Sequence, residues 1–167
     1  MSNFRNKHFE GALYTFEHLT PLTLDVSLTV KQELLSIPIN VTFGCHCFTE
    51  KFDSDTHGEH FRYQHLTEVR AFDVERYQCS LHLPSVIQGI VSGTIYRSDQ
   101  NYTYVTQINL PTLTGLQPYS IFFSLEKTRR SVTPEVEMYV KSAYISALKS
   151  GTNAQNWRFK KLIADTL

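Results

Sequence analysis

The chain has 167 residues, of which 41% are hydrophobic, and its 16 Lys and Arg balance its 16 Asp and Glu. This size and composition provide one hydrophobic core but not two, and they exclude a coiled coil, a collagen-like chain and a wholly disordered one. The net charge of zero hides an asymmetry, because residues 1–75 carry 6 basic and 11 acidic side chains whereas residues 76–167 carry 10 and 5. The basic C-terminal part fits an anionic ligand, although ordinary scatter of solvated charges gives similar counts.

The sequence indicates a cytoplasmic protein that has no contact with a membrane. No apolar run reaches the roughly 18 residues of a membrane span, and the N-terminal residues lack the apolar stretch of a signal peptide. Cys45, Cys47 and Cys79 are an odd number of cysteines, and the first two are too close within one strand to be bridged easily. Free thiols in a reducing compartment are therefore expected.

The first half of the chain predicts a β-hairpin followed by a long loop. Residues 22–30 and 37–48 alternate apolar and polar side chains, and the intervening KQELLS is a plausible connection between two antiparallel strands. Residues 49–66 are polar and rich in Asp and His, without a sustained period, which is typical of a loop. A short strand is expected around Glu68 to Phe72.

Helical signals follow that strand. Asp73 is a good helix N-cap, and Pro84 suits the first turn of a second helix, so residues 74–92 predict two short helices or one kinked helix that ends at Gly93. A period of two then returns, with β-branched and aromatic residues separated by turn sequences. It predicts a four-stranded antiparallel meander over residues 94–97, 102–110, 119–127 and 136–146. A final amphipathic helix is expected near residues 155–165.

These elements predict a single α+β domain. It comprises an N-terminal hairpin and loop over residues 1–72, a helical segment and meander over residues 73–150, and a C-terminal helix over residues 151–167.

Several short motifs carry a resemblance to known proteins. Cys45-His46-Cys47-Phe48, Glu75-Arg76-Tyr77 with Ser80 and Leu83-Pro84, and Ser142-Ala143-Tyr144 resemble an uncharacterised family of small bacterial proteins over most of the chain. The order of elements from Asp73 to Ser146 is also similar to the barnase/EndoU/colicin/RelE group of endoribonucleases. That resemblance implies a small twisted sheet packed on a helix. It also implies RNA cleavage by His, Arg, Lys, Ser or Thr and Tyr side chains without a metal.

Cleavage by the neighbouring 2′-hydroxyl needs a base, an acid and a cation for the charged phosphorane, and it needs no cofactor. The candidate catalytic residues are His82 and Tyr144 for proton transfer, Arg76 and Lys127 for charge, and Ser142 as a hydrogen-bond donor. The candidate RNA-binding residues are Arg129, Arg130, Tyr102 and Tyr104. Ser142 and Tyr144 share one strand face, and they alternatively mark the polar rim of a core stripe formed by Val136, Met138 and Val140.

A metal site is the weaker interpretation of the cysteine and histidine residues. Cys45 and Cys47 can be combined on paper with His57, His60 or His65, but no Cys-x-x-Cys occurs. In a regular strand His46 faces away from the two cysteines, unless Gly44 permits a bulge. Two buried thiols explain the pattern more simply, and no bound metal is predicted.

The sequence thus favours a metal-independent endoribonuclease of toxin type, with RNA as substrate and a neutralising protein as a second partner. A non-catalytic protein- or nucleic-acid-binding module and a zinc-organised interaction protein are the alternatives. If the acidic N-terminal part covers the basic surface, deletion of residues 1–65 should increase RNA binding, provided that the remainder folds.

Overall fold

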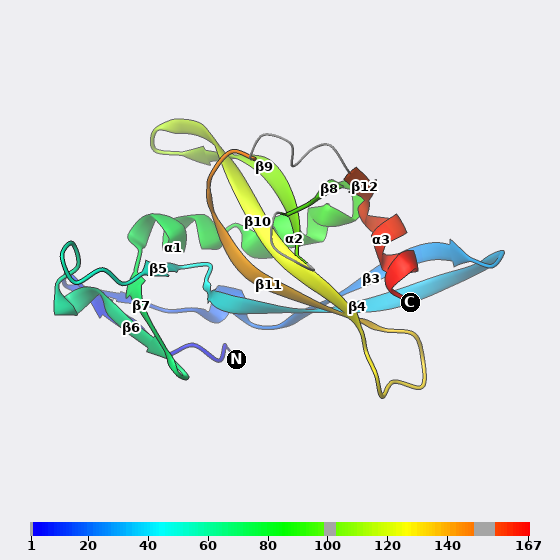
Figure 1. Ribbon diagram of the computed structural model, residues 1–167, viewed down its shortest axis with the longest axis horizontal. Helices are drawn as coiled ribbons and strands as arrows, with labels where there is room; N and C mark the ends of the chain where they lie inside the picture. The colour runs from blue at the N-terminus through cyan, green and yellow to red at the C-terminus, as the bar shows by residue number, and fades with distance from the viewer. Residues whose placement is uncertain (1, 99–102, 149–155) are drawn as a thin grey trace.

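The computed structural model describes residues 2–98, 103–148 and 156–167, and it has an α+β fold built around one twisted sheet (Figure 1). This sheet has seven strands in the order β12-β8-β9-β10-β11-β4-β3. Their bounds are β12 (Asn156–Arg158), β8 (Thr94–Arg97), β9 (Tyr104–Thr112), β10 (Gly115–Lys127), β11 (Val136–Ile145), β4 (Glu33–His46) and β3 (Leu22–Val30). The α+β class expected from the sequence is confirmed.

The predicted meander is present, but it forms four of the seven strands of a larger sheet instead of a sheet of its own. Strands β8, β9, β10 and β11 pair antiparallel in sequence order. The N-terminal hairpin of β3 and β4 then joins the meander, because β4 pairs in parallel with β11 from Val136 opposite Ile39 to Ser142 opposite His46. Nothing local in the sequence indicates a pairing between segments this far apart.

The turn between β3 and β4 is shorter than the predicted KQELLS connection. Val30 pairs directly with Glu33, and the two residues between them, Lys31 and Gln32, have φ values of 50° and 69°. Two successive positive φ angles define a tight hairpin turn whose twist matches that of the flanking strands. The apolar Leu34 therefore belongs to the strand, although its side chain is 78% exposed.

The expectation of a long loop over residues 49–66 is wrong in part. This segment contains β5 (Thr49–Lys51), a 3₁₀ turn (Glu59–Phe61) and β6 (Arg62–His65). Both strands pair antiparallel with β7 (Glu68–Phe72), whose bounds agree with the predicted strand, and they form a small three-stranded sheet. Strands of three or four residues are too short to show a period, so composition alone indicated a loop. Two further short strands, β1 (Lys7–Phe9) and β2 (Ala12–Tyr14), form a hairpin.

Two short helices follow β7, as the sequence predicts. α1 (Val74–Ser80) begins after Asp73, whose carboxylate accepts a hydrogen bond from the backbone N–H of Arg76. α2 (Leu83–Gly89) has Pro84 in its first turn and continues into a 3₁₀ turn (Ile90–Ser92). The C-terminal helix, α3 (Phe159–Thr166), is also present, but the residues just before it form β12.

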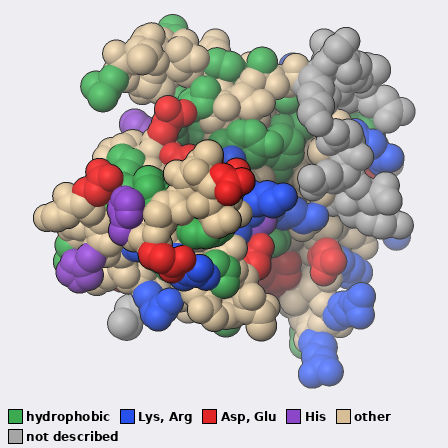
Figure 2. Space-filling view, turned by 60° about the vertical axis from the view of Figure 1, so that its left-hand side comes forward, with side chains coloured by type: hydrophobic (Ala, Val, Ile, Leu, Met, Phe, Trp, Pro, Cys, Tyr) green, Lys and Arg blue, Asp and Glu red, His purple; other side chains and the backbone are tan. Residues whose placement is uncertain are grey.

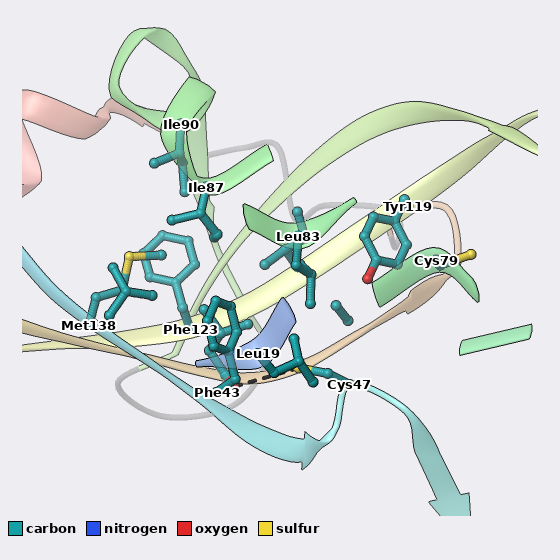
Figure 3. Close-up of a cluster of buried hydrophobic side chains, with 14 of the residues drawn as sticks. Leu19, Phe43, Cys47, Cys79, Leu83, Ile87, Ile90, Tyr119, Phe123 and Met138 are labelled. Atoms are coloured by element: carbon teal, nitrogen blue, oxygen red, sulfur yellow. Dashed lines mark hydrogen bonds between the residues drawn. The ribbon is translucent and has the colours of Figure 1, made fainter. Parts of the chain in front are cut away.

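Buried side chains from both halves of the chain meet in one core (Figure 3). Leu83 and Ile87 of α2 lie over Phe123 of β10 and Met138 of β11, and Cys47 points into the same cluster from beyond the end of β4. Every one of these side chains is almost completely buried. Within the described residues, no helix combines the length and the apolar character that crossing a membrane requires.

A bulge at Lys141 changes which face of β11 is buried. Phe123 of β10 pairs with Val140, and the preceding residue, Phe122, pairs with Ser142, so the register skips Lys141. The buried stripe therefore passes from Val140 to Ala143. Ser142 and Tyr144 share a face, as predicted, but they do not continue the Val136, Met138 and Val140 stripe.

Candidate functional site

The candidate site lies where β4 separates from β11. Beyond His46, β4 leaves the seven-stranded sheet and turns into β5, so the last residues of β11 lose their neighbour on that side. Gly44 makes this departure possible. A Cβ at position 44 would lie 2.5 Å from the Tyr139 hydroxyl and 3.0 Å from the Lys141 carbonyl oxygen. A larger residue at this position would have to displace the Tyr139 side chain and press against the Lys141 carbonyl, so the close approach favours glycine.

The bend brings the side chains of Cys45, His46 and Glu68 together. Nε2 of His46 is 2.7 Å from Oε1 of Glu68, and the thiol of Cys45 donates to Oε2 of Glu68 over 3.6 Å. The three ligand atoms all lie within 4.8 Å of one another. Cys45 is buried, His46 is partly exposed and Glu68, at the start of β7, is half-exposed. We call these residues the Cys45–His46–Glu68 cluster.

The structure does not bring together the two cysteines and two histidines that the sequence offers as candidate zinc ligands. Cys47 faces the core and donates to the Val140 carbonyl over 3.8 Å. His57 is 2.8 Å from a carboxylate oxygen of Glu50, and His60 and His65 pack against Phe9 and Phe4 respectively. Sequence reasoning named Cys45 and His46 but missed Glu68. Glu68 lies on a separate strand, and its spacing from Cys45 and His46 in the sequence matches no metal-binding motif.

Burial and neighbouring charge set the protonation of this region. Burial, reinforced by the Glu68 carboxylate, raises the pKa of the Cys45 thiol to about 11. The hydrogen bond from His46 lowers the pKa of Glu68, which therefore stays ionised. Burial also raises the pKa of Cys47 to about 12 and that of the Tyr139 hydroxyl above its ordinary value. Without a ligand, Cys45 is a neutral thiol that donates to an anionic carboxylate.

Two arginines fix the turn that follows the cluster. Arg70 and Arg76 both donate to the carbonyl oxygen of Thr49, over 3.3 and 2.7 Å, and Arg76 also donates to the carbonyl oxygen of His46 over 3.2 Å. The Thr49 hydroxyl donates back to the Cys45 carbonyl over 2.7 Å. Nε of Arg76 also lies 3.9 Å from a carboxylate oxygen of Asp73. These bonds hold α1 against the end of β4.

Arg76 also contacts Tyr144, so two sequence-predicted residues meet. The guanidinium carbon is 4.5 Å from the centroid of the Tyr144 ring, which stacks on Phe122 at 5.4 Å. Ser142 lies opposite His46 in the parallel pair of strands. No hydrogen bond between described residues uses Nη2 of Arg76, Oγ of Ser142 or the Tyr144 hydroxyl, and the bonds of Arg76 to backbone carbonyls use Nη1. Three donors of this region are thus available to a ligand.

A cavity of about 200 Å³ opens beside this contact. Its lining residues are Glu50, Asp73, Glu75, Arg76, Cys79, Tyr144 and Ile145. It adjoins a larger groove of about 930 Å³ between α1 and the β9–β10 turn, which includes Leu81, His82, Leu110 and Leu113. Figure 2 shows exposed hydrophobic side chains beneath the projecting β9–β10 turn.

The remaining predicted site residues lie elsewhere. His82 is the exposed residue before α2 and lines the larger groove, so it does not contact the Arg76 cavity. Lys127 ends β10 at the opposite end of the strand and donates to the carbonyl oxygen of Leu167, and Arg129 and Arg130 follow it in the β10–β11 connection. Tyr104 packs against Phe123 and Trp157, and Tyr102 falls outside the described residues.

Comparison with known proteins identifies a family. The model of the YjaZ family matches residues 6–167. Neither the curated proteins nor the solved structures contain a significant match. Because the family model spans nearly the whole chain, this protein belongs to the YjaZ family.

Proposed function

We propose that this protein is a metal-independent endoribonuclease of toxin type and that it cleaves RNA at the end of β11. Three observations support the proposal: the contact of Arg76 with Tyr144, the position of Ser142 opposite His46 in the strand register, and the hydrogen-bonded His46–Glu68 pair. A cation, hydroxyl donors and a carboxylate-oriented imidazole are the groups that cleavage by a 2′-hydroxyl requires. Relative to the sequence-based proposal, His46 takes the place of His82.

Each side chain then has a defined role. The imidazole of His46, held by Glu68 through Nε2, accepts the proton of the 2′-hydroxyl, and the 2′-oxygen attacks the phosphorus. The free Nη2 of Arg76 and the hydroxyl of Ser142 donate to the phosphorane oxygens. The Tyr144 hydroxyl gives its proton to the departing 5′-oxygen. The products are a 2′,3′-cyclic phosphate and a free 5′-hydroxyl.

The carboxylates around the cavity do not prevent phosphate binding, because two of them already have partners. Glu50 is held by His57 over 2.8 Å, and Asp73 caps α1 and lies beside the Arg76 guanidinium. Each of these contacts reduces the negative potential that a phosphate group meets in the cavity. Glu75 remains on the rim, where its charge is screened by solvent.

The direct test is cleavage of a labelled RNA of mixed sequence by the purified protein in the presence of a chelator. We expect fragments that end in a 2′,3′-cyclic phosphate. His46→Gln removes the proposed base and should lower the rate about 10²- to 10⁴-fold. Tyr144→Phe keeps the ring on Arg76 and Phe122 while removing the proposed acid, and it should lower the rate similarly.

His82→Gln is the matched control, since His82 is exposed and its side chain does not cap α2. This variant should cleave at the wild-type rate. RNA that stays intact with folded wild-type protein contradicts the nuclease proposal, and retained RNA binding in that case identifies a non-catalytic binding module. Cleavage that survives both His46→Gln and Tyr144→Phe also contradicts it.

A further inference from the structure

We propose that the Cys45–His46–Glu68 cluster is a site for one zinc ion, with the fourth ligand position open to water or to an added ligand. The proposal goes beyond RNA cleavage and does not depend on it. It rests on the donor set, the distances between donor atoms and the rigidity of the strands that hold them.

The donors have the chemistry that zinc selects. The cluster offers one sulfur, one imidazole nitrogen and one carboxylate oxygen, all of which are zinc ligands in proteins. Once the thiol is deprotonated, a thiolate and a carboxylate balance the charge of a divalent ion. The softer sulfur ligand favours zinc over magnesium or calcium, which prefer oxygen.

The distances are close to those of a tetrahedral site. Zinc bonds of about 2.3 Å to sulfur and about 2.1 Å to oxygen place those two ligand atoms roughly 3.6 Å apart in a tetrahedron. The Cys45 sulfur and Glu68 Oε2 are 3.6 Å apart already. His46 Nε2 contacts the other carboxylate oxygen, Oε1, at 2.7 Å, so the ring must move away from Oε1 before Nε2 and Oε2 can bind the same ion. The partly exposed His46 ring has room to make this movement.

In the metal-free cluster, protons occupy the place of the ion. The thiol S–H of Cys45 and the ring nitrogen of His46 both meet the Glu68 carboxylate. An ion inserted among the three atoms replaces both contacts, and the ring proton then resides on Nδ1 of the partly exposed His46. The thiol proton leaves to solvent as the zinc–sulfur bond forms.

The surrounding residues hold the ligands in place. The Thr49 hydroxyl bonds the Cys45 carbonyl, Arg76 bonds the His46 carbonyl, and Glu68 is paired with His65 in the small sheet. Outer contacts of this kind fix ligand orientation before an ion arrives. The cluster is therefore preorganised on β4 and β7 instead of lying on a loop.

The site has a consequence for the proposed nuclease. A zinc ion on Nε2 of His46 displaces Glu68 from the imidazole and leaves the ring proton on Nδ1, so the ring can no longer accept the proton of the 2′-hydroxyl. Zinc occupancy and RNA cleavage are then mutually exclusive. Zinc is expected to inhibit cleavage, and a chelator is expected to restore it.

The test uses Co²⁺ as a spectroscopic probe, titrated into the full-length, metal-free protein in the absence of RNA. We expect one Co²⁺ per chain, a thiolate-to-cobalt charge-transfer band and displacement of the cobalt by Zn²⁺. Cys45→Ser should abolish that band. Glu68→Gln should weaken Co²⁺ binding by more than about 100-fold. Loss of a residue that only hydrogen-bonds a metal ligand already lowers metal affinity by up to about 100-fold, and Glu68 is a direct ligand.

Cys79→Ser and His82→Gln serve as matched controls, because they remove a buried thiol and an exposed imidazole outside the cluster. Both should bind Co²⁺ as the wild type does. Glu68→Gln alters a half-exposed side chain, so it remains informative if Cys45→Ser fails to fold, as circular dichroism will show.

Two results would overturn the zinc site. One is the absence of the charge-transfer band with excess Co²⁺, and the other is a band that persists in folded Cys45→Ser or is unchanged in Glu68→Gln. The outcome is separate from that of the RNA assay. A chain that binds zinc but leaves RNA intact supports this inference alone, and a chain that cleaves RNA but binds no metal supports the nuclease alone.

Discussion

Gly44 is the residue on which the geometry of the cluster depends. A methyl group at this position would contact the hydroxyl of Tyr139 and the carbonyl oxygen of Lys141 at distances that well-packed side chains do not adopt. We predict that Gly44→Ala lowers the free energy of unfolding by about 1–3 kcal/mol, the usual cost of overpacking a packed site. Urea unfolding followed by circular dichroism measures this difference.

Tyr139 provides the control for that prediction. Its side chain is 44% exposed, so Tyr139→Ala alone should cost little. In the double variant Gly44→Ala/Tyr139→Ala the clash with the ring is gone and only the contact with the Lys141 carbonyl remains. Part of the lost stability should return, and strictly additive effects would argue against the proposed clash.

Some site residues could be recognised from the sequence and others could not. Arg76, Ser142 and Tyr144 stand in short motifs, and the structure places Arg76 on Tyr144 and Ser142 beside His46. Glu68 gave no signal, because its partners are 22 and 23 residues away and only the bend after Gly44 brings them into reach. Close packing of two backbones is a tertiary property that periodicity does not encode.

At the scale of elements, the docking of a 3₁₀ turn (Glu17–Leu19) on α1 depends on a half-buried histidine. His18 Nε2 lies 2.8 Å from the Ser80 hydroxyl, which itself donates to the Tyr77 carbonyl, and the His18 ring packs edge-on against Tyr77. Burial lowers the pKa of His18 below its ordinary value of 6.5. The folded protein therefore favours the neutral imidazole.

This pKa shift predicts a loss of stability in mild acid. As the pH falls below 6.5, the unfolded chain binds a proton at His18 before the folded chain does, so the free energy of unfolding decreases until the folded pKa is passed. His18→Gln can still donate a hydrogen bond to Ser80 but does not titrate. The advantage of wild type over His18→Gln should shrink between pH 7.5 and pH 5 in urea unfolding experiments. A constant difference across this range contradicts the prediction.

Element boundaries were predictable where the chemistry is local. The Asp73 cap, the proline of α2 and the alternation of β8 to β11 all lie in sequence beside the structure that they specify. The short strands β5 and β6 were missed for the opposite reason. They are stabilised by pairing with β7 and not by their own pattern.

At the scale of the whole molecule, residues 1–65 supply two of the seven strands of the main sheet. They contribute β3 and β4, with the buried side chains of Ile37, Ile39, Val41 and Phe43. The expected gain in RNA binding after deletion of residues 1–65 requires that the remainder folds, and the structure argues against this condition. The deletion removes the parallel neighbour of β11 and one side of the core.

We predict that residues 66–167 alone do not fold. Without β4, the buried Val136, Met138 and Val140 are exposed to water, at a cost of about 1.5–3 kcal/mol for each side chain, which is a large part of the stability of a domain of this size. Thermal unfolding of the fragment, followed by near-ultraviolet circular dichroism, should show no cooperative transition. A sharp transition would show that the C-terminal part is an independent unit.

The parallel pairing of β4 with β11 also affects the order in which the proposed zinc site and the proposed RNA-cleaving site form. The β3–β4 hairpin closes through a two-residue turn and forms quickly, whereas contacts such as that of Cys47 with Val140 must close a gap of 93 residues. Synthesis delivers His46 and Glu68 before Ser142 and Tyr144. If both proposals hold, a nascent chain carries the proposed zinc ligands before the residues proposed to cleave RNA, and metal capture precedes activity in a newly made molecule.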